Sequence, residues 1–250
     1  MKTMKTVRTF ALLLVLAALL SACSAGAMEL KFENGALRDE KNEVTFLSAP
    51  FNYKAVAIEP DRQVAIIKTS KGADVPLYAV EGMDRAKWIA REDYTLYYRS
   101  DVSLPTLREM QVTYVTVSRV SGTALEAGRL ESRAEIDDLV ETYEQGTTIP
   151  RDKVTVTPAA RFELLFFSDT YAGISYSLEY WKFDSEVIVY AALTESGEIP
   201  SLYPGISASI EEVSGERVAV FRLGKGLIYD RVQNCVYAVG SVVEDYFNAA

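Results

Sequence analysis

Residues 162–183 read FELLFFSDTYAGISYSLEYWKF, and this stretch decides the class of fold. Its first part, residues 162–167, is an apolar and aromatic run, which is typical of a strand buried on both faces or nearly so. From residue 174 onward apolar and polar residues alternate, so that every second residue from Ile174 to Tyr180 would share one face of a strand. Both segments therefore predict strands inside a sheet.

Working outward from this stretch, similar short β-prone runs recur between turn residues, a spacing that favours hairpins or a meander. We expect further strands at residues 55–58, 64–68, 75–80, 94–98, 111–120, 187–193, 218–223, 227–229 and 235–239. Most of the chain is therefore expected to form sheet.

Helices are expected to be fewer and short. Residues 132–144 form the best candidate, because Ser132 and Glu135 can make a capping box and apolar residues recur at helical spacing. Two shorter helices are expected at residues 241–248 and 84–90. The predicted fold class is α+β, mainly antiparallel sheet with two or three short helices.

The order of these segments leaves two domain layouts open. A strand–strand–helix pattern in residues 62–90 resembles one in residues 217–248, which would fit a duplication, although the spacings differ and any two hairpins look alike. A duplicated chain would divide near residues 121–130, the most linker-like stretch. Otherwise residues 31–250 form one domain.

The first residues have the parts of a secretory signal, with a basic start followed by eleven uncharged residues, 10–20. A membrane-spanning helix needs about 20 apolar residues, so this stretch is too short to be one. The residues Leu20-Ser21-Ala22-Cys23 resemble the lipobox of bacterial lipoproteins. The resemblance implies that residues 1–22 are a signal peptide cut before Cys23, that the Cys23 thiol carries a diacylglyceryl group, and that residues 23–30 form a tether.

This resemblance carries an expectation about location. Two acyl chains give a stable anchor where one gives only marginal binding, so we expect the protein on the extracytoplasmic face of the cell membrane, held there by its lipid. Ser24 stands where an Asp would, by resemblance to Gram-negative lipoproteins, signal retention at the inner membrane, and which membrane is used stays open. Residues 168–181 and 227–231 are similar in style to uncharacterised lipoproteins of Gram-positive anaerobes, a similarity that implies no activity.

The charge of the chain limits its partners. The net charge is −9, and it becomes −12 once the three basic residues of the signal are removed. Such a surface repels the phosphates of nucleic acids and of anionic lipids. We therefore expect no nucleic-acid partner, and we expect the folded part to stand off the membrane.

Residue content excludes several catalytic chemistries. The sequence contains no His, so it cannot supply a Ser-His-Asp triad, a Cys–His pair or a His metal site, and we expect no metal and no cofactor. With Cys23 lipidated, Cys235 stands alone and is expected to be buried and unreactive. Gly224-Lys225-Gly226 is expected to be a hairpin turn rather than a phosphate cradle. Two carboxylates could still hydrolyse a glycan, but no spacing singles out a pair among the 35 acidic residues.

Aromatic residues in the expected strands are the remaining candidates for a binding site. Tyr and Trp combine an apolar ring with a polar tip, which suits protein or sugar surfaces, although sheet cores use the same residues. Trp181 and Tyr97 fall on the faces less committed to a core, so we expect them in an exposed ligand-binding patch. The expected function is non-catalytic binding of another envelope protein or an extracellular ligand. The alternatives are an assembly accessory, which an open strand edge would favour, and a glycan hydrolase, which a cleft with paired acids would favour.

Overall fold

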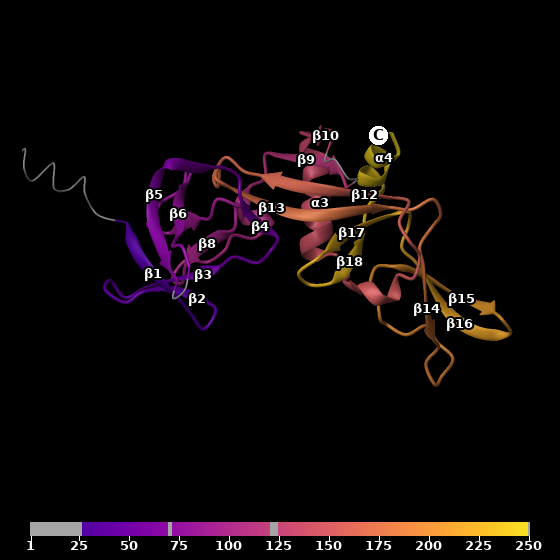
Figure 1. The fold of residues 1–250 in the computed structure, drawn as a ribbon. Coiled ribbons are helices and arrows are strands. Elements are labelled where there is room, and N and C mark those ends of the chain that lie inside the picture. Colours follow the sequence, from indigo (N-terminus) through magenta and orange to yellow (C-terminus); the bar gives the residue numbers. More distant parts are fainter. Residues whose placement is uncertain (1–26, 70–71, 121–124, 250) are drawn as a thin grey trace, which may run out of the picture.

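The computed structural model of the chain describes residues 27–69, 72–120 and 125–249. The expected signal peptide, the lipobox and Cys23 lie outside these residues. The described chain forms three sheets: a closed barrel, a large sheet and a small three-stranded sheet. Figure 1 shows the barrel at one end of the molecule, the large sheet in the middle and the small sheet at the opposite end.

The N-terminal part of the described chain is a seven-stranded barrel. In pairing order its strands are β1 (Met28–Glu33), β2 (Ala36–Asp39), β3 (Val44–Ser48), β8 (Leu96–Arg99), β7 (Trp88–Ala90), β6 (Val75–Val80) and β5 (Ile58–Lys68). The barrel closes through the parallel pair of β1 and β5. Inward-facing side chains, among them Leu30, Phe46 and Leu77, are fully buried and fill the interior.

The large sheet has eight strands. They are β10 (Leu125–Leu130), β9 (Tyr114–Arg119), β12 (Ala160–Phe167), β13 (Ile174–Lys182), β17 (Gly226–Asp230), β18 (Cys235–Ala238), β11 (Ile149–Pro150) and β4 (Tyr53–Ala55). β4 lies between two barrel strands in the sequence and pairs with β13, so it ties the barrel to the large sheet.

Helices cover one face of the large sheet. They are α2 (Leu107–Met110), α3 (Arg133–Gln145) and α4 (Ser241–Ala249). Alternation along the strands turns Leu164 and Leu178 toward this side, where they share one core with Leu139 of α3 and Phe247 of α4. The other face of the sheet is left to the small sheet and to solvent.

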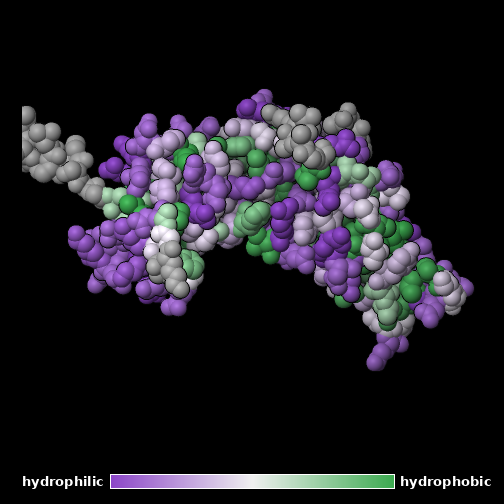
Figure 2. Space-filling view, viewed as in Figure 1, coloured by the Kyte–Doolittle hydropathy of each residue, from purple (hydrophilic) through white to green (hydrophobic). Residues whose placement is uncertain are grey.

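The small sheet consists of β14 (Ile188–Ala192), β16 (Glu216–Arg222) and β15 (Ser207–Val213), with β16 in the centre. Val189 and Phe221 pack against Trp181 and Leu227 of the large sheet, together with residues near the 3-10 turn at Arg151–Lys153. Figure 2 shows hydrophobic surface gathered over this end of the molecule. The small sheet therefore covers one part of the helix-free face.

The expected α+β class is wrong. Strands make up 47% of the described residues and helices 12%, and one of the sheets closes into a barrel. Helices take part in the core of one sheet only, because the barrel fills itself with its own side chains and the small sheet packs on strands. The protein is a mostly β structure with helices added to one face.

Several local expectations also change. Residues 84–90 do not form a helix: a turn at Asp84 leads into β7, and Trp88 is buried as a strand residue. α3 starts where predicted, but Ser132 makes no side-chain cap, so the capping box is absent. Residues 162–167 are buried on one face only. The linker-like stretch contains β10, which pairs with β9.

None of the helices in the described part of the chain has the length and apolar character that crossing a membrane requires.

Candidate functional site

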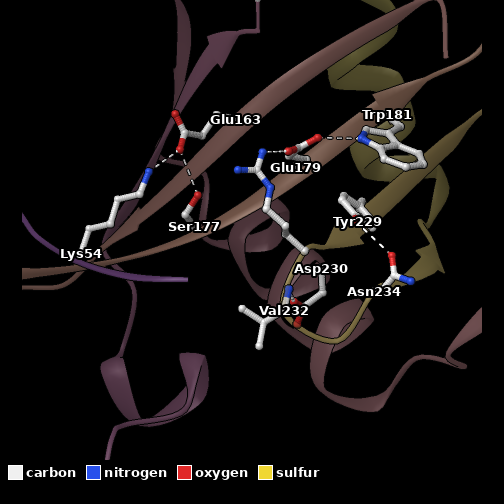
Figure 3. Close-up of polar contacts among 10 residues, drawn as sticks. Lys54, Glu163, Ser177, Glu179, Trp181, Tyr229, Asp230, Val232 and Asn234 are labelled. Atoms are coloured by element: carbon white, nitrogen blue, oxygen red, sulfur yellow. Dashed lines mark hydrogen bonds and ion pairs between the residues drawn. The ribbon is translucent and has the colours of Figure 1, made fainter. Parts of the chain in front are cut away.

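The candidate site is a groove on the helix-free face of the large sheet. Strands β12 and β13 are antiparallel and place Glu163 directly opposite Glu179. Residues directly opposite in such a pair have Cβ atoms about 5 Å apart, so the two carboxylates are neighbours on one face. The groove has a volume of about 200 Å³ and is also lined by Phe51, Asn52 and Val120. Figure 3 shows the two glutamates with their polar partners.

Glu163 is held by partners from two strands. Its Oε1 accepts hydrogen bonds from Lys54 Nζ of β4 at 2.8 Å and from Ser177 Oγ of β13 at 3.1 Å. Burial alone would raise the pKa of this carboxyl, but the bond and charge of Lys54, with the Ser177 bond and the charge of Arg231, together outweigh burial, and its pKa lies below the ordinary value. Glu163 is therefore an ionised member of an ion pair.

Glu179 is held in the same way by a different cation. Trp181 Nε1 donates a hydrogen bond to its Oε2 at 2.9 Å, and the guanidinium of Arg231 is ion-paired with its Oε1. Only 7% of Glu179 is exposed. Because a buried carboxylate without a partner would be costly, Arg231 and Trp181 are what allow this charge on the sheet.

An exposed phenylalanine forms the rim of the groove. Phe51 is 59% exposed, and its ring lies 5.7 Å from Lys54 Nζ and 5.2 Å from the guanidinium carbon of Arg231. Both distances are within the range of cation–π attraction. Val120, another residue that lines the groove, is 50% exposed. The rim thus presents apolar side chains around a neutralised pair of acids.

A buried polar network supports the groove from the other face of the sheet. Asp230, which has no exposed surface, accepts hydrogen bonds from Asn52 Nδ2 at 3.0 Å and from Tyr143 Oη at 2.7 Å. Its Oδ1 also accepts from the backbone N–H groups of Val232 and Gln233. Asp230 and Arg231 are consecutive and reach opposite sides of the sheet, so this network fixes the backbone from which Arg231 extends.

Comparison of the chain with protein-family models, curated proteins and solved structures finds no match.

The aromatic residues expected in an exposed patch are both buried. Trp181 is 3% exposed and packs between the large and small sheets, with the Arg151 guanidinium above its ring. Tyr97 is 8% exposed and belongs to the core of the barrel. The expectation of an exposed patch formed by these two side chains is wrong, because sheet packing uses both. Trp181 nevertheless takes part in the site through its bond to Glu179.

Two other sequence expectations can be compared with the structure. Cys235 is buried as expected, and burial raises the pKa of its thiol. Gly224 has the positive φ of a turn residue, but the strands before and after it belong to different sheets, so the expected hairpin is absent. The amides of Lys225 and Gly226 instead bind the carboxylate of Glu244 in α4.

No sequence pattern singled out Glu163, Glu179, Lys54 or Arg231 as site residues. One signal was present, since the alternation after residue 174 places Ser177 and Glu179 together on the less apolar face. Their partners come from distant parts of the chain, which alternation within one strand cannot identify.

Proposed function

We propose that this protein is a lipid-anchored protein of the extracytoplasmic face of a bacterial membrane that binds a protein partner through the groove. The lipobox resemblance at Cys23 supports the anchor. The observation that carries the binding role is the rim of the groove, where exposed Phe51 lies against the cations of Lys54 and Arg231. Aromatic residues and Arg are enriched in protein interfaces.

A protein suits this groove better than a small molecule. Small-molecule sites usually enclose roughly 300 to 1,000 Å³, and the groove offers about 200 Å³. Its floor consists of carboxylates that already have cationic partners, so it adds little free charge to an interface. An exposed aromatic ring beside a neutralised floor is suited to burial by another protein surface.

The paired acids do not favour glycan hydrolysis. Hydrolysis of that kind needs one carboxyl kept protonated as an acid, which requires a raised pKa. The pKa of Glu163 is lowered by Lys54, and Glu179 is ion-paired with Arg231. Each carboxylate is therefore already engaged by a cation.

The position of the groove is compatible with an anchor at Cys23. Met28, the first residue of β1, is five positions after Cys23, so the lipid would attach within about 18 Å of the barrel. The barrel would then be the membrane-proximal part, and the large sheet would carry the groove away from the membrane (Figure 1).

A pull-down from native membranes tests the proposed function. The chain beginning at Ser24, which keeps every described residue, is compared with its Phe51→Ser variant. Phe32→Ser is the matched control, because Phe32 is 64% exposed and lies on the barrel, away from the groove. The proposal expects a partner captured by the parent chain and by Phe32→Ser, and lost with Phe51→Ser. Equal capture by all three chains would contradict it.

The small sheet supports a second candidate function, that of an assembly accessory. Within the described residues, β14 and β15 each pair only with β16, so both outer edges present unpaired backbone groups. Such edges can accept a strand from another chain. Substituting Ile210 of β15 by Pro, which removes a backbone donor, would then abolish assembly while leaving binding at the groove intact.

A further inference from the structure

A second cavity, of about 450 Å³, lies on the helix side of the large sheet. Four tyrosines contribute to its lining, and we call it the tyrosine pocket: Tyr53 from β4, Tyr143 from α3, Tyr176 from β13 and Tyr237 from β18. Its volume falls within the roughly 300 to 1,000 Å³ that small-molecule sites occupy. The tyrosine pocket is thus large enough for a small-molecule ligand, whereas the groove is smaller than such sites usually are.

Hydrogen bonds hold these tyrosines in fixed positions. Tyr143 Oη donates to Asp230, and it lies 2.5 Å from Tyr176 Oη. Tyr53 Oη donates to the carbonyl of Pro105 at 2.7 Å, and Tyr237 Oη donates to Gln233 Oε1 at 3.3 Å. A wall that is already ordered loses little conformational entropy when a ligand binds.

The pocket offers nothing that would select an anion. None of the described residues that line it is Lys or Arg, and its one carboxylate, Glu144, is ion-paired with Arg108. Burial raises the pKa of the tyrosine hydroxyls, so the wall itself stays uncharged near neutral pH. The lining therefore favours a ligand without negative charge.

The ring geometry also argues against a quaternary ammonium ligand. Aromatic cages for such cations surround them with ring faces. Here the ring centroids of Tyr53 and Tyr176 are 4.8 Å apart, those of Tyr143 and Tyr176 are 5.7 Å apart, and those of Tyr143 and Tyr237 are 5.3 Å apart. Rings this close contact each other and leave no cation-sized gap between them.

We propose that the tyrosine pocket binds a neutral saccharide. A sugar ring has an apolar C–H face that can lie on a tyrosine ring, and its hydroxyl groups can pair with the polar groups at the mouth. Gln233 and Thr148 are exposed there and lie among the lining residues. The Gln233 amide bonds Tyr143 and Tyr237 but keeps a second hydrogen on Nε2. An apolar ligand that covered this group and the Thr148 hydroxyl would therefore cost free energy. This proposal is independent of protein binding at the groove.

Saturation-transfer NMR tests the saccharide proposal on the chain beginning at Ser24. The probes are three neutral trisaccharides, chitotriose, maltotriose and cellotriose, with choline and inorganic phosphate as competitors. We expect transfer to at least one trisaccharide, undiminished by either competitor. Absence of transfer to all three, or displacement by choline or phosphate, would overturn the proposal.

Variants then locate the binding. Gln233→Ala should weaken it about tenfold, the size expected for one lost hydrogen bond, and Thr148→Trp should abolish it by filling the pocket. Gln63→Ala is the matched control, because Gln63 is an exposed residue of β5 in the barrel. Thermal unfolding confirms that each variant is folded. Equal affinity in all variants would place the sugar elsewhere and overturn the proposal, whereas the Phe51→Ser variant should bind the sugar normally.

Discussion

Glu163 and Glu179 lie directly opposite each other on β12 and β13, and each is bound by its own cation. Two like charges at this position of a sheet would repel each other. Lys54 and Arg231 remove that repulsion, and both also lie close to the ring of Phe51. The charge balance of the sheet and the shape of the proposed binding rim therefore depend on the same two side chains.

Removing the Lys54 charge is expected to destabilise the fold. Lys54→Met leaves the half-buried Glu163 beside Glu179 without its cation, and we expect a loss of about 1 kcal/mol, a value already reduced for solvent screening. Urea unfolding measures the change. Lys31→Met is the control, because the pair of Lys31 and Glu40 is exposed, and no measurable change is expected there. Equal effects in both variants would contradict the role given to Lys54.

The pH dependence of stability should contain a contribution from Glu163. Its pKa in the folded protein lies below the ordinary value of 4.5, so the folded state favours the ionised form. The stabilisation is present above pH 4.5 and is lost as pH falls through the folded pKa. Urea unfolding between neutral and acidic pH should therefore show a shallower acid loss in Glu163→Gln than in the parent chain. An unchanged slope would exclude this contribution.

The buried network around Asp230 should be sensitive to one hydroxyl group. Tyr143→Phe removes the hydrogen bond to Asp230 Oδ2, and an unsatisfied buried acceptor costs about 1 to 3 kcal/mol. Tyr190→Phe is the matched control, since Tyr190 is 54% exposed, and it should change stability little. Thermal or urea unfolding gives both values. A loss in Tyr190→Phe as large as that in Tyr143→Phe would show that the network is not its cause.

Membrane attachment should depend on Cys23. Cys23→Ala removes the thiol that the lipobox resemblance assigns to the diacylglyceryl group, so the chain should be released or left unprocessed. Fractionation of cells, with the length of the chain determined by mass spectrometry, measures both outcomes. Full partition with membranes after normal cleavage would contradict the anchor. Cys235→Ala is the control and should leave attachment unchanged, because that thiol is buried.

The alternation and helical spacing of apolar residues predicted those strands and helices whose structure depends mainly on nearby residues. Strand β6 occupies Val75–Val80, where it was predicted, and α3 begins within one residue of its predicted start. The barrel was not predicted. β1 alternates apolar and charged residues as a strand does, but its parallel pairing with β5, far along the chain, is what closes the barrel, and alternation within one strand does not reveal that partner. A short helix at residues 84–90 would place Trp88 and Ile89 inward, but the pairing of β7 with β6 and β8 makes residues 88–90 a strand.

The residues of the candidate site were harder to predict from the sequence than the fold. Glu163 and Lys54 are 109 residues apart, and Glu179 and Arg231 are 52 residues apart. Their meeting depends on the pairing of β4 and β17 with β13, which no spacing within one strand reveals. Trp181 was assigned to an exposed face because alternation does not show that a second sheet covers part of that face.

Photo-crosslinking in cells tests the proposed binding role most directly. A photoreactive phenylalanine analogue is placed at position 51, on the rim of the groove, or at position 32, on the barrel. Both native side chains are exposed phenylalanines, so the two sites differ in place rather than in chemistry. The proposed function predicts a discrete crosslinked protein from position 51 and none from position 32. No crosslink at position 51, or the same product from both positions, would contradict it.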